Sequence, residues 1–187
     1  DKGQPVLLFD RGFSGTRKLY AANPNGQESS LLTLKTQNNA FQVAVAFEAS
    51  PPRFWYHSDF FVNLPDSSLV TTTPGEAPTA APFVLDNGCH ARGELMPWVT
   101  PDGAWMFFSA TYPDPASGCA PQNGAPAHLF AVPLDPSGLL LGGAMAQPIF
   151  PNEPSSQVSP SLSPDRCTLY FSQIGAQGSV MYGAARQ

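Results

Sequence analysis

One stretch of sequence occurs twice in this chain and decides its fold: MPWVTPDGAWMFFS at residues 96–109 and SPSLSPDRCTLYFS at residues 159–172. Both copies place Pro-Asp before a run of bulky apolar residues that ends in Phe-Ser. Proline presets φ for a turn and aspartate bonds back to its own backbone, so each copy predicts a tight turn between two short strands. This turn chemistry needs no catalytic role for its residues, which are Pro101, Asp102, Gly103, Pro164 and Asp165.

A second signature accompanies the hairpins: an aromatic strand that enters a turn or ends a unit. It reads HLFAVPLDPSG at 128–138, KLYAANPNG at 18–26 and SVMYGAA at 179–185. A repeat at this scale indicates an array of similar supersecondary units. We predict four units of three or four short antiparallel strands, near residues 5–34, 40–74, 93–148 and 157–187. Long loops are expected at 74–92 and 111–127.

The composition excludes several classes of protein. The 187 residues include 21 Pro and 16 Gly, which cannot recur inside helices, so a helical bundle is excluded and a doubly wound α/β fold is disfavoured. The net charge of −5 opposes nucleic-acid binding, and no apolar run is long enough to span a membrane. Because 42% of the residues are hydrophobic, a packed core is expected. The class that remains is an all-β domain with many loops.

The repeated residues resemble those of TolB-type β-propellers. In that family Ser-Pro-Asp-Gly precedes a strand ending in Phe-Ser, and an aromatic strand then enters an Asn/Asp-x-x-Gly turn. The resemblance covers three of the four units. The second unit has ASPPR at 49–53 in place of Pro-Asp, and Arg166 stands where glycine is expected. The resemblance implies a β-propeller of about four blades, or a segment of a larger one.

The two end units are expected to be incomplete. The first has only Asp1–Gln4 before the strand that starts at Val6, and the last stops after its third strand. Exposed edge strands invite pairing with another chain, so a protein partner or further sequence is expected. The chain also starts at Asp1 rather than Met, as a processed or excised piece does.

Three cysteines allow one disulfide and one free thiol. Cys89 and Cys119 lie in Pro/Gly-rich stretches on either side of an apolar segment, and we expect them to be bonded to each other. Cys167 alternates with apolar residues and is expected to be a buried small hydrophobe. With few lysines, this disulfide favours the periplasm of a bacterium or the medium outside it.

Spacing that carries catalysis or metal binding is absent from the sequence. His57, His90 and His128 have no Cys-x-x-Cys or His-x-x-x-His neighbours, so neither a metal nor a cofactor is expected. The stretch GFSG at 12–15 is one residue short of a nucleophile elbow and is interpreted as a hairpin loop. Paired acids could hydrolyse glycosides; the candidates are Asp10, Asp59, Glu94, Asp102 and Asp165.

Aromatic residues are the remaining signal for a binding site. Most belong to the core, but some of them are candidates for a surface that stacks on a sugar or docks a protein; these are Trp55, Tyr56, Phe60 and Trp98. We therefore expect a non-enzymatic module for protein–protein interaction in a bacterial envelope or extracellular assembly. The alternatives are a carbohydrate-active propeller, lectin-like or a glycoside hydrolase, and an accessory domain that gates a hydrolase.

Overall fold

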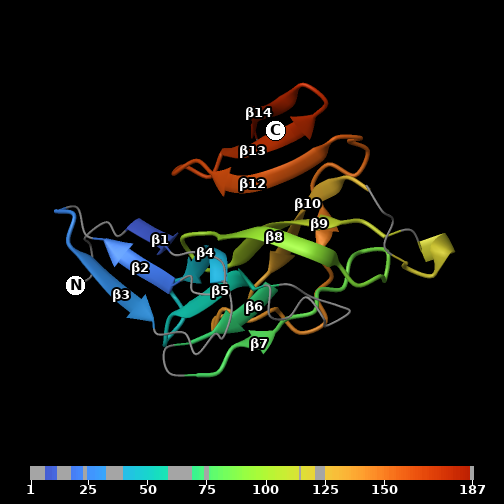
Figure 1. Ribbon diagram of the computed structural model, residues 1–187. Helices are drawn as coiled ribbons and strands as arrows, with labels where there is room; N and C mark the ends of the chain where they lie inside the picture. Colours follow the sequence, from blue (N-terminus) through green and yellow to red (C-terminus); the bar gives the residue numbers. More distant parts are fainter. Residues whose placement is uncertain are drawn as a thin grey trace.

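A computed structural model of the chain describes residues 7–11, 18–22, 25–32, 40–58, 69–73, 76–113, 115–120 and 125–185. Their strands form four antiparallel sheets, which confirms the all-β class (Figure 1). In every sheet the strands lie in chain order, each paired with the next. This arrangement is what short strands joined by Pro, Gly and Asp turns produce.

The sheets are numbered along the chain. Sheet 1 contains β1 (Leu7–Arg11), β2 (Lys18–Ala22) and β3 (Glu28–Leu32). Sheet 2 contains β4 (Ala40–Ala46), β5 (Arg53–Ser58), β6 (Leu69–Thr72) and β7 (Thr79–Ala80). Sheet 3 contains β8 (Arg92–Val99), β9 (Trp105–Thr111), β10 (Ala127–Pro133) and β11 (Gln147–Pro148). Sheet 4 contains β12 (Ser156–Leu162), β13 (Thr168–Gly175) and β14 (Gly178–Ala185).

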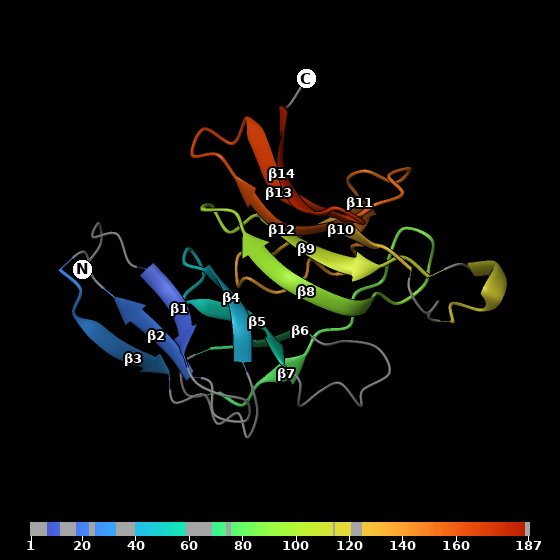
Figure 2. The same cartoon turned by 45° about the horizontal axis from the view of Figure 1, so that its top comes forward.

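The sheets pack in series. Strand β1 contacts β4, β4 contacts β8, and β8 contacts β12, so the first strand of each sheet lies beside the first strand of the next (Figure 2). Sheets 2 and 3 have four strands each, and sheets 1 and 4 have three each among the described residues. Closure of the series into a ring is not seen in the part of the chain that the structure describes.

The two Pro-Asp turns have the same hydrogen bonds. In the first, the Gly103 amide donates to the Thr100 carbonyl at 2.8 Å, and in the second the Arg166 amide donates to the Ser163 carbonyl at 2.8 Å. Gly103 and Arg166 both have left-handed backbones, with φ of 68° and 60°. Arginine therefore adopts, at a steric cost, the conformation that glycine adopts freely.

The first strands of sheets 2, 3 and 4 share a β-bulge. Gln42, Met96 and Ser159 have φ of 57°, 53° and 57°, and the register shifts at each of these places. The Met96 amide donates to Oε1 of Gln42 at 2.9 Å, and the Ser159 hydroxyl donates to the Met96 sulfur. Side chains and backbone at the bulges therefore link the first strands of three successive sheets, β4, β8 and β12.

The largest core cluster lies between sheets 2 and 3. Its aromatic rings form a continuous series in which the centroids of Trp55 and Phe83 are 5.9 Å apart, those of Phe83 and Phe108 4.5 Å, and those of Phe108 and Phe130 5.7 Å. All four side chains are buried. Fully burying a large apolar side chain is worth about 1.5–3 kcal/mol, so these four rings together stabilise the contact between sheets 2 and 3 substantially.

A smaller cluster holds sheet 4 on sheet 3. Leu129 of β10 packs against Leu169 and Phe171 of β13, and Phe107 of β9 and Phe150 lie around them. Alternation along β9 explains how one strand serves both clusters, because Phe108 points to sheet 2 and Phe107 to sheet 4. Sheet 3 is thus apolar on both of its faces.

A disulfide joins the segment before β8 to the long connection between β9 and β10. Cys89 and Cys119, the pair expected from the sequence, are joined with their Cα atoms 5.5 Å apart. Beside the bond, the Asn87 side-chain amide donates to the Pro113 carbonyl at 2.9 Å, and the Tyr112 hydroxyl donates to Asp86 at 2.7 Å. Closing a loop of sequence separation 30 is worth about 3–4 kcal/mol on the chain-entropy estimate.

Some expectations need correction. The loop expected at 74–92 contains β7 and a turn in which Val84 bridges His90, and the loop at 111–127 contains a 3-10 turn at Pro115–Ser117. Cys167 is exposed rather than buried. The alternation is right, but β13 begins at Thr168, so Cys167 lies in the turn beyond the end of the sheet and has no strand to cover it.

We predict that Gly138→Ala destabilises the protein by about 3 kcal/mol, from a left-handed penalty of about 1–2 kcal/mol and overpacking of similar size. Gly138 has φ of +73°, and a Cβ there would lie 2.9 Å from Cβ of Ala46 and 3.2 Å from Cβ of Arg53. Gly143→Ala is the matched control, because Gly143 has φ of +76° and open space around it. Urea unfolding measures both variants, and equal losses would contradict the packing argument.

Candidate binding surfaces

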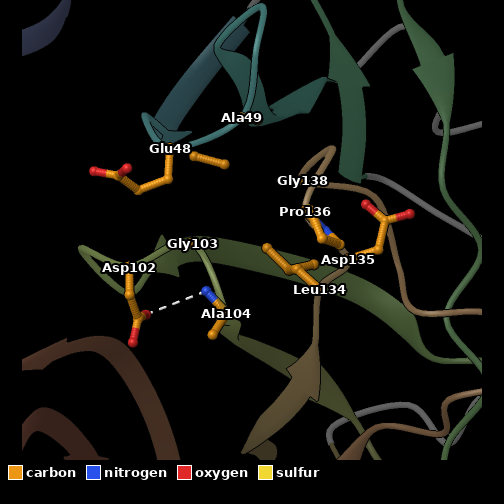
Figure 3. Close-up of a pocket in the computed structure, with 10 residues that line it drawn as sticks. Glu48, Ala49, Asp102, Gly103, Ala104, Leu134, Asp135, Pro136 and Gly138 are labelled. Carbon is orange, nitrogen blue, oxygen red and sulfur yellow. Dashed lines mark hydrogen bonds between the residues drawn. The ribbon is translucent and has the colours of Figure 1, made fainter.

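Three turns meet at one end of sheets 2 and 3 and enclose a pocket of about 250 Å³ (Figure 3). They are the β4–β5 turn, the Pro-Asp turn between β8 and β9, and the turn after β10. Trp55 of β5 fixes the turn after β10, because its indole N–H donates to the Gly138 carbonyl at 2.9 Å. The lining combines small apolar side chains with the carboxylates of Glu48, Asp102 and Asp135.

The three carboxylates do not form an acid–base pair. Figure 3 shows them on different sides of the pocket, pointing away from one another. The pKa of Asp102 is lowered by hydrogen bonds from the Thr100 side chain and the Ala104 amide, with help from Arg166. The pKa of Asp135 is lowered by hydrogen bonds from Ser137 and Leu139. Both carboxylates therefore serve as hydrogen-bond acceptors that stabilise their own turns.

Asp102 and Asp165, the two candidate glycosidase acids whose side chains are described, do not fit the role of general acid. A general acid needs a raised pKa, whereas Asp102 and Asp165 have lowered ones. For Asp165 the causes are the hydrogen bonds from the Ser163 hydroxyl and the Cys167 amide. Asp59 lies outside the described residues, and the side chains of Asp10 and Glu94 are likewise not described.

A second hollow, the aromatic groove, lies between sheets 3 and 4 and has a volume of about 620 Å³. Trp105, which is 44% exposed, lies at its edge, and Phe107 and Leu169 are among its apolar lining. Arg166 forms an ion pair with Asp102, and both residues line the groove. The groove thus presents an aromatic ring beside a paired cation and anion.

The aromatic residues predicted to bind a partner are not gathered on the surface. Trp55 and Tyr56 are fully buried, which corrects that prediction and matches the alternative that they belong to the core. Trp55 belongs to the cluster between sheets 2 and 3, and Tyr56, on the opposite face of β5, packs with Val70 and Val43 of sheet 2. Trp98 is half-buried with its ring 5.9 Å from that of Phe107, and Phe60 lies outside the described residues.

Half of the exposed large hydrophobic residues of the described part of the chain lie on sheet 4. We call them the sheet-4 surface; they are Tyr170, Ile174, Val180, Met181 and Tyr182. By register, Tyr170, Ile174 and Met181 lie on the face away from sheet 3, whereas Val180 and Tyr182 lie on the same face as Phe171. Sequence reasoning missed them because their pattern is that of core strands: Tyr170 aligns with Phe107, and Tyr182 with Phe130. One feature of the sequence could have indicated an unusual surface here: no charged residue occurs between Arg166 and Arg186.

The histidines are dispersed through the fold. His57 is buried, His90 is exposed, and His128 is half-buried with its pKa lowered by burial, an effect that Glu153 opposes. Across the described ranges, no group of three or more His, Cys, Asp or Glu side chains is placed to hold a metal ion. Nor do those ranges contain a helix with the length and apolarity to cross a membrane.

Comparison with known proteins identifies no relative. No protein-family model matches the chain, and no curated protein matches its sequence.

We predict that the protein loses stability in acid and that Asp102→Asn loses less. The pKa of Asp102 is lowered by folding, so the folded state binds fewer protons than the unfolded chain. The stabilisation is complete above the unfolded pKa of about 3.9 and is lost as pH falls through the folded value. Unfolding measured in urea between neutral pH and acid tests this. Equal acid sensitivity of the two proteins would contradict it.

Proposed function

We propose that this chain is a β-propeller-type repeat module of TolB-like character that acts as a non-enzymatic scaffold and binds another protein. The sheet-4 surface is the observation that carries the proposal. In sheet 3, Leu129 is fully buried because sheet 4 covers it. Its equivalent in sheet 4 is Met181, which is 75% exposed. Equivalent residues are identified by register: Leu129 pairs with Ser109, and Met181 pairs with Ser172, the matching serine of the repeat.

An apolar patch of this kind is typical of a protein-interaction site. Monomeric proteins rarely expose large contiguous apolar areas, and aromatic residues and methionine are enriched at interfaces. On the face of sheet 4 away from sheet 3, such a patch is formed by Tyr170, Ile174 and Met181, and Val180 and Tyr182 add exposed apolar area on the other face of β14. The Cys89–Cys119 disulfide supports a periplasmic or extracellular location for the complex, because disulfides persist in oxidising compartments.

We predict that Met181→Lys weakens partner binding at least tenfold, because losing a buried methionine costs about 1.5–3 kcal/mol of apolar burial and a lysine adds desolvation. Leu141→Lys is the matched control, since Leu141 is exposed and apolar but lies after sheet 3's third strand. The partner is captured with the wild-type chain, purified, and titrated against all three proteins by calorimetry. Equal affinities would remove the sheet-4 surface from the proposal, and turnover of a substrate would contradict the non-enzymatic role.

A second candidate function, carbohydrate binding, is favoured by the aromatic groove. Trp105 presents an exposed ring for stacking, and Asp102 and Arg166 supply polar groups next to it. For a sugar bound there, Trp105→Ala is expected to lower affinity at least tenfold, whereas Met181→Lys leaves it unchanged. A glycan array probed with the three proteins makes the comparison. Trp55 is unsuitable for such a test because it is a core residue.

A further inference from the structure

The outer edge of sheet 4 differs from the outer edges of sheets 2 and 3. In sheets 2 and 3 the third strand pairs with a fourth, β7 or β11, each only two residues long. In sheet 4 the third strand, β14, is eight residues long and pairs with β13 along its whole length without a register shift. No strand within the described ranges lies on its other side. One long row of backbone groups is therefore open to pairing.

This edge has none of the features by which proteins protect exposed strands. Natural edges are short, charged, interrupted by proline or distorted by bulges. Strand β14, with the sequence GSVMYGAA, contains neither a charged residue nor a proline. Val180 and Tyr182 alternate with Met181 and all three are exposed, so β14 is open on both faces as well as along its edge. Such a strand is a template for another strand.

The charge of the chain bears on which strand can pair with it. The net charge is −5, which opposes close approach of two copies at most surfaces. From Cys167 to Ala185 the β13–β14 hairpin carries no charge, so two copies can meet here without bringing like charges together. Antiparallel pairing of a strand with itself about a twofold axis also gives each copy the same contacts, which is the commonest form of homo-oligomer.

Resting on the proposed function, we propose that the partner at sheet 4 is a second copy of this chain, whose β14 pairs antiparallel with the β14 described here. The two three-stranded sheets then form one continuous sheet across a twofold axis. The pairing satisfies the open backbone groups of both edge strands and places Val180, Met181 and Tyr182 beside side chains of the second copy on each face of the joined sheet. The side chains of sheet 3 remain engaged with sheet 4 within each copy.

Sedimentation equilibrium of the purified chain over a range of concentrations tests the proposal. We expect a reversible dimer whose dissociation constant is at least tenfold larger for Met181→Lys. The dissociation constant of Leu141→Lys is expected to equal that of the wild type. Circular dichroism and urea unfolding show whether each variant is folded, and Met181 is exposed enough for its replacement to be tolerated. A dimer that Met181→Lys leaves intact would show that the contact lies elsewhere and would overturn the proposal.

Amide hydrogen exchange separates edge pairing from contact between side chains alone. In the dimer, the β14 amides that point away from β13 gain protection at least tenfold as concentration rises. A monomer at every concentration, with those amides protected only when another protein is added, would replace the second copy by a strand of that protein and leave the proposed function standing. If Met181→Lys changes neither self-association nor the binding of another protein, both proposals are overturned.

Discussion

The structure depends on one constraint: a sheet that is apolar on both faces must be covered on both. Sheet 3 shows it most clearly, because alternate residues of β9 face opposite neighbours, Phe108 toward sheet 2 and Phe107 toward sheet 4. Stacking in series is the simplest arrangement that covers every such face of a chain of short strands. The same constraint makes sheet 4 the unusual element, since one of its faces has no neighbour among the described residues.

Much of this architecture could be predicted from the sequence because its cause is local. Pro101-Asp102 and Pro164-Asp165 determine turns through proline's fixed φ and aspartate's hydrogen bonds to nearby backbone, so hairpins on either side follow directly. Alternation then predicts strands. The Cys89–Cys119 pair was also accessible, because both cysteines lie in connections at the ends of an apolar segment.

What the sequence could not supply depends on tertiary contacts. Trp55 and Tyr56 have the composition of a docking site, and only their complete burial in the folded chain shows that they are core. The bulges at Met96 and Ser159 are aligned in the repeat, yet neither residue is one that commonly takes a left-handed backbone. Met181 is exposed because no described sheet packs on that face of sheet 4, and the local sequence pattern does not encode this.

The two core clusters have a consequence for how the molecule comes apart. The cluster between sheets 2 and 3 contains most of the buried side chains, whereas Leu129, Leu169 and Phe171 are the fully packed residues between sheets 3 and 4. In a stack where each unit contacts its neighbours, stability is approximately a sum of separate interface terms. The contact between sheets 3 and 4 is therefore expected to open before the contact between sheets 2 and 3 under force or in denaturant.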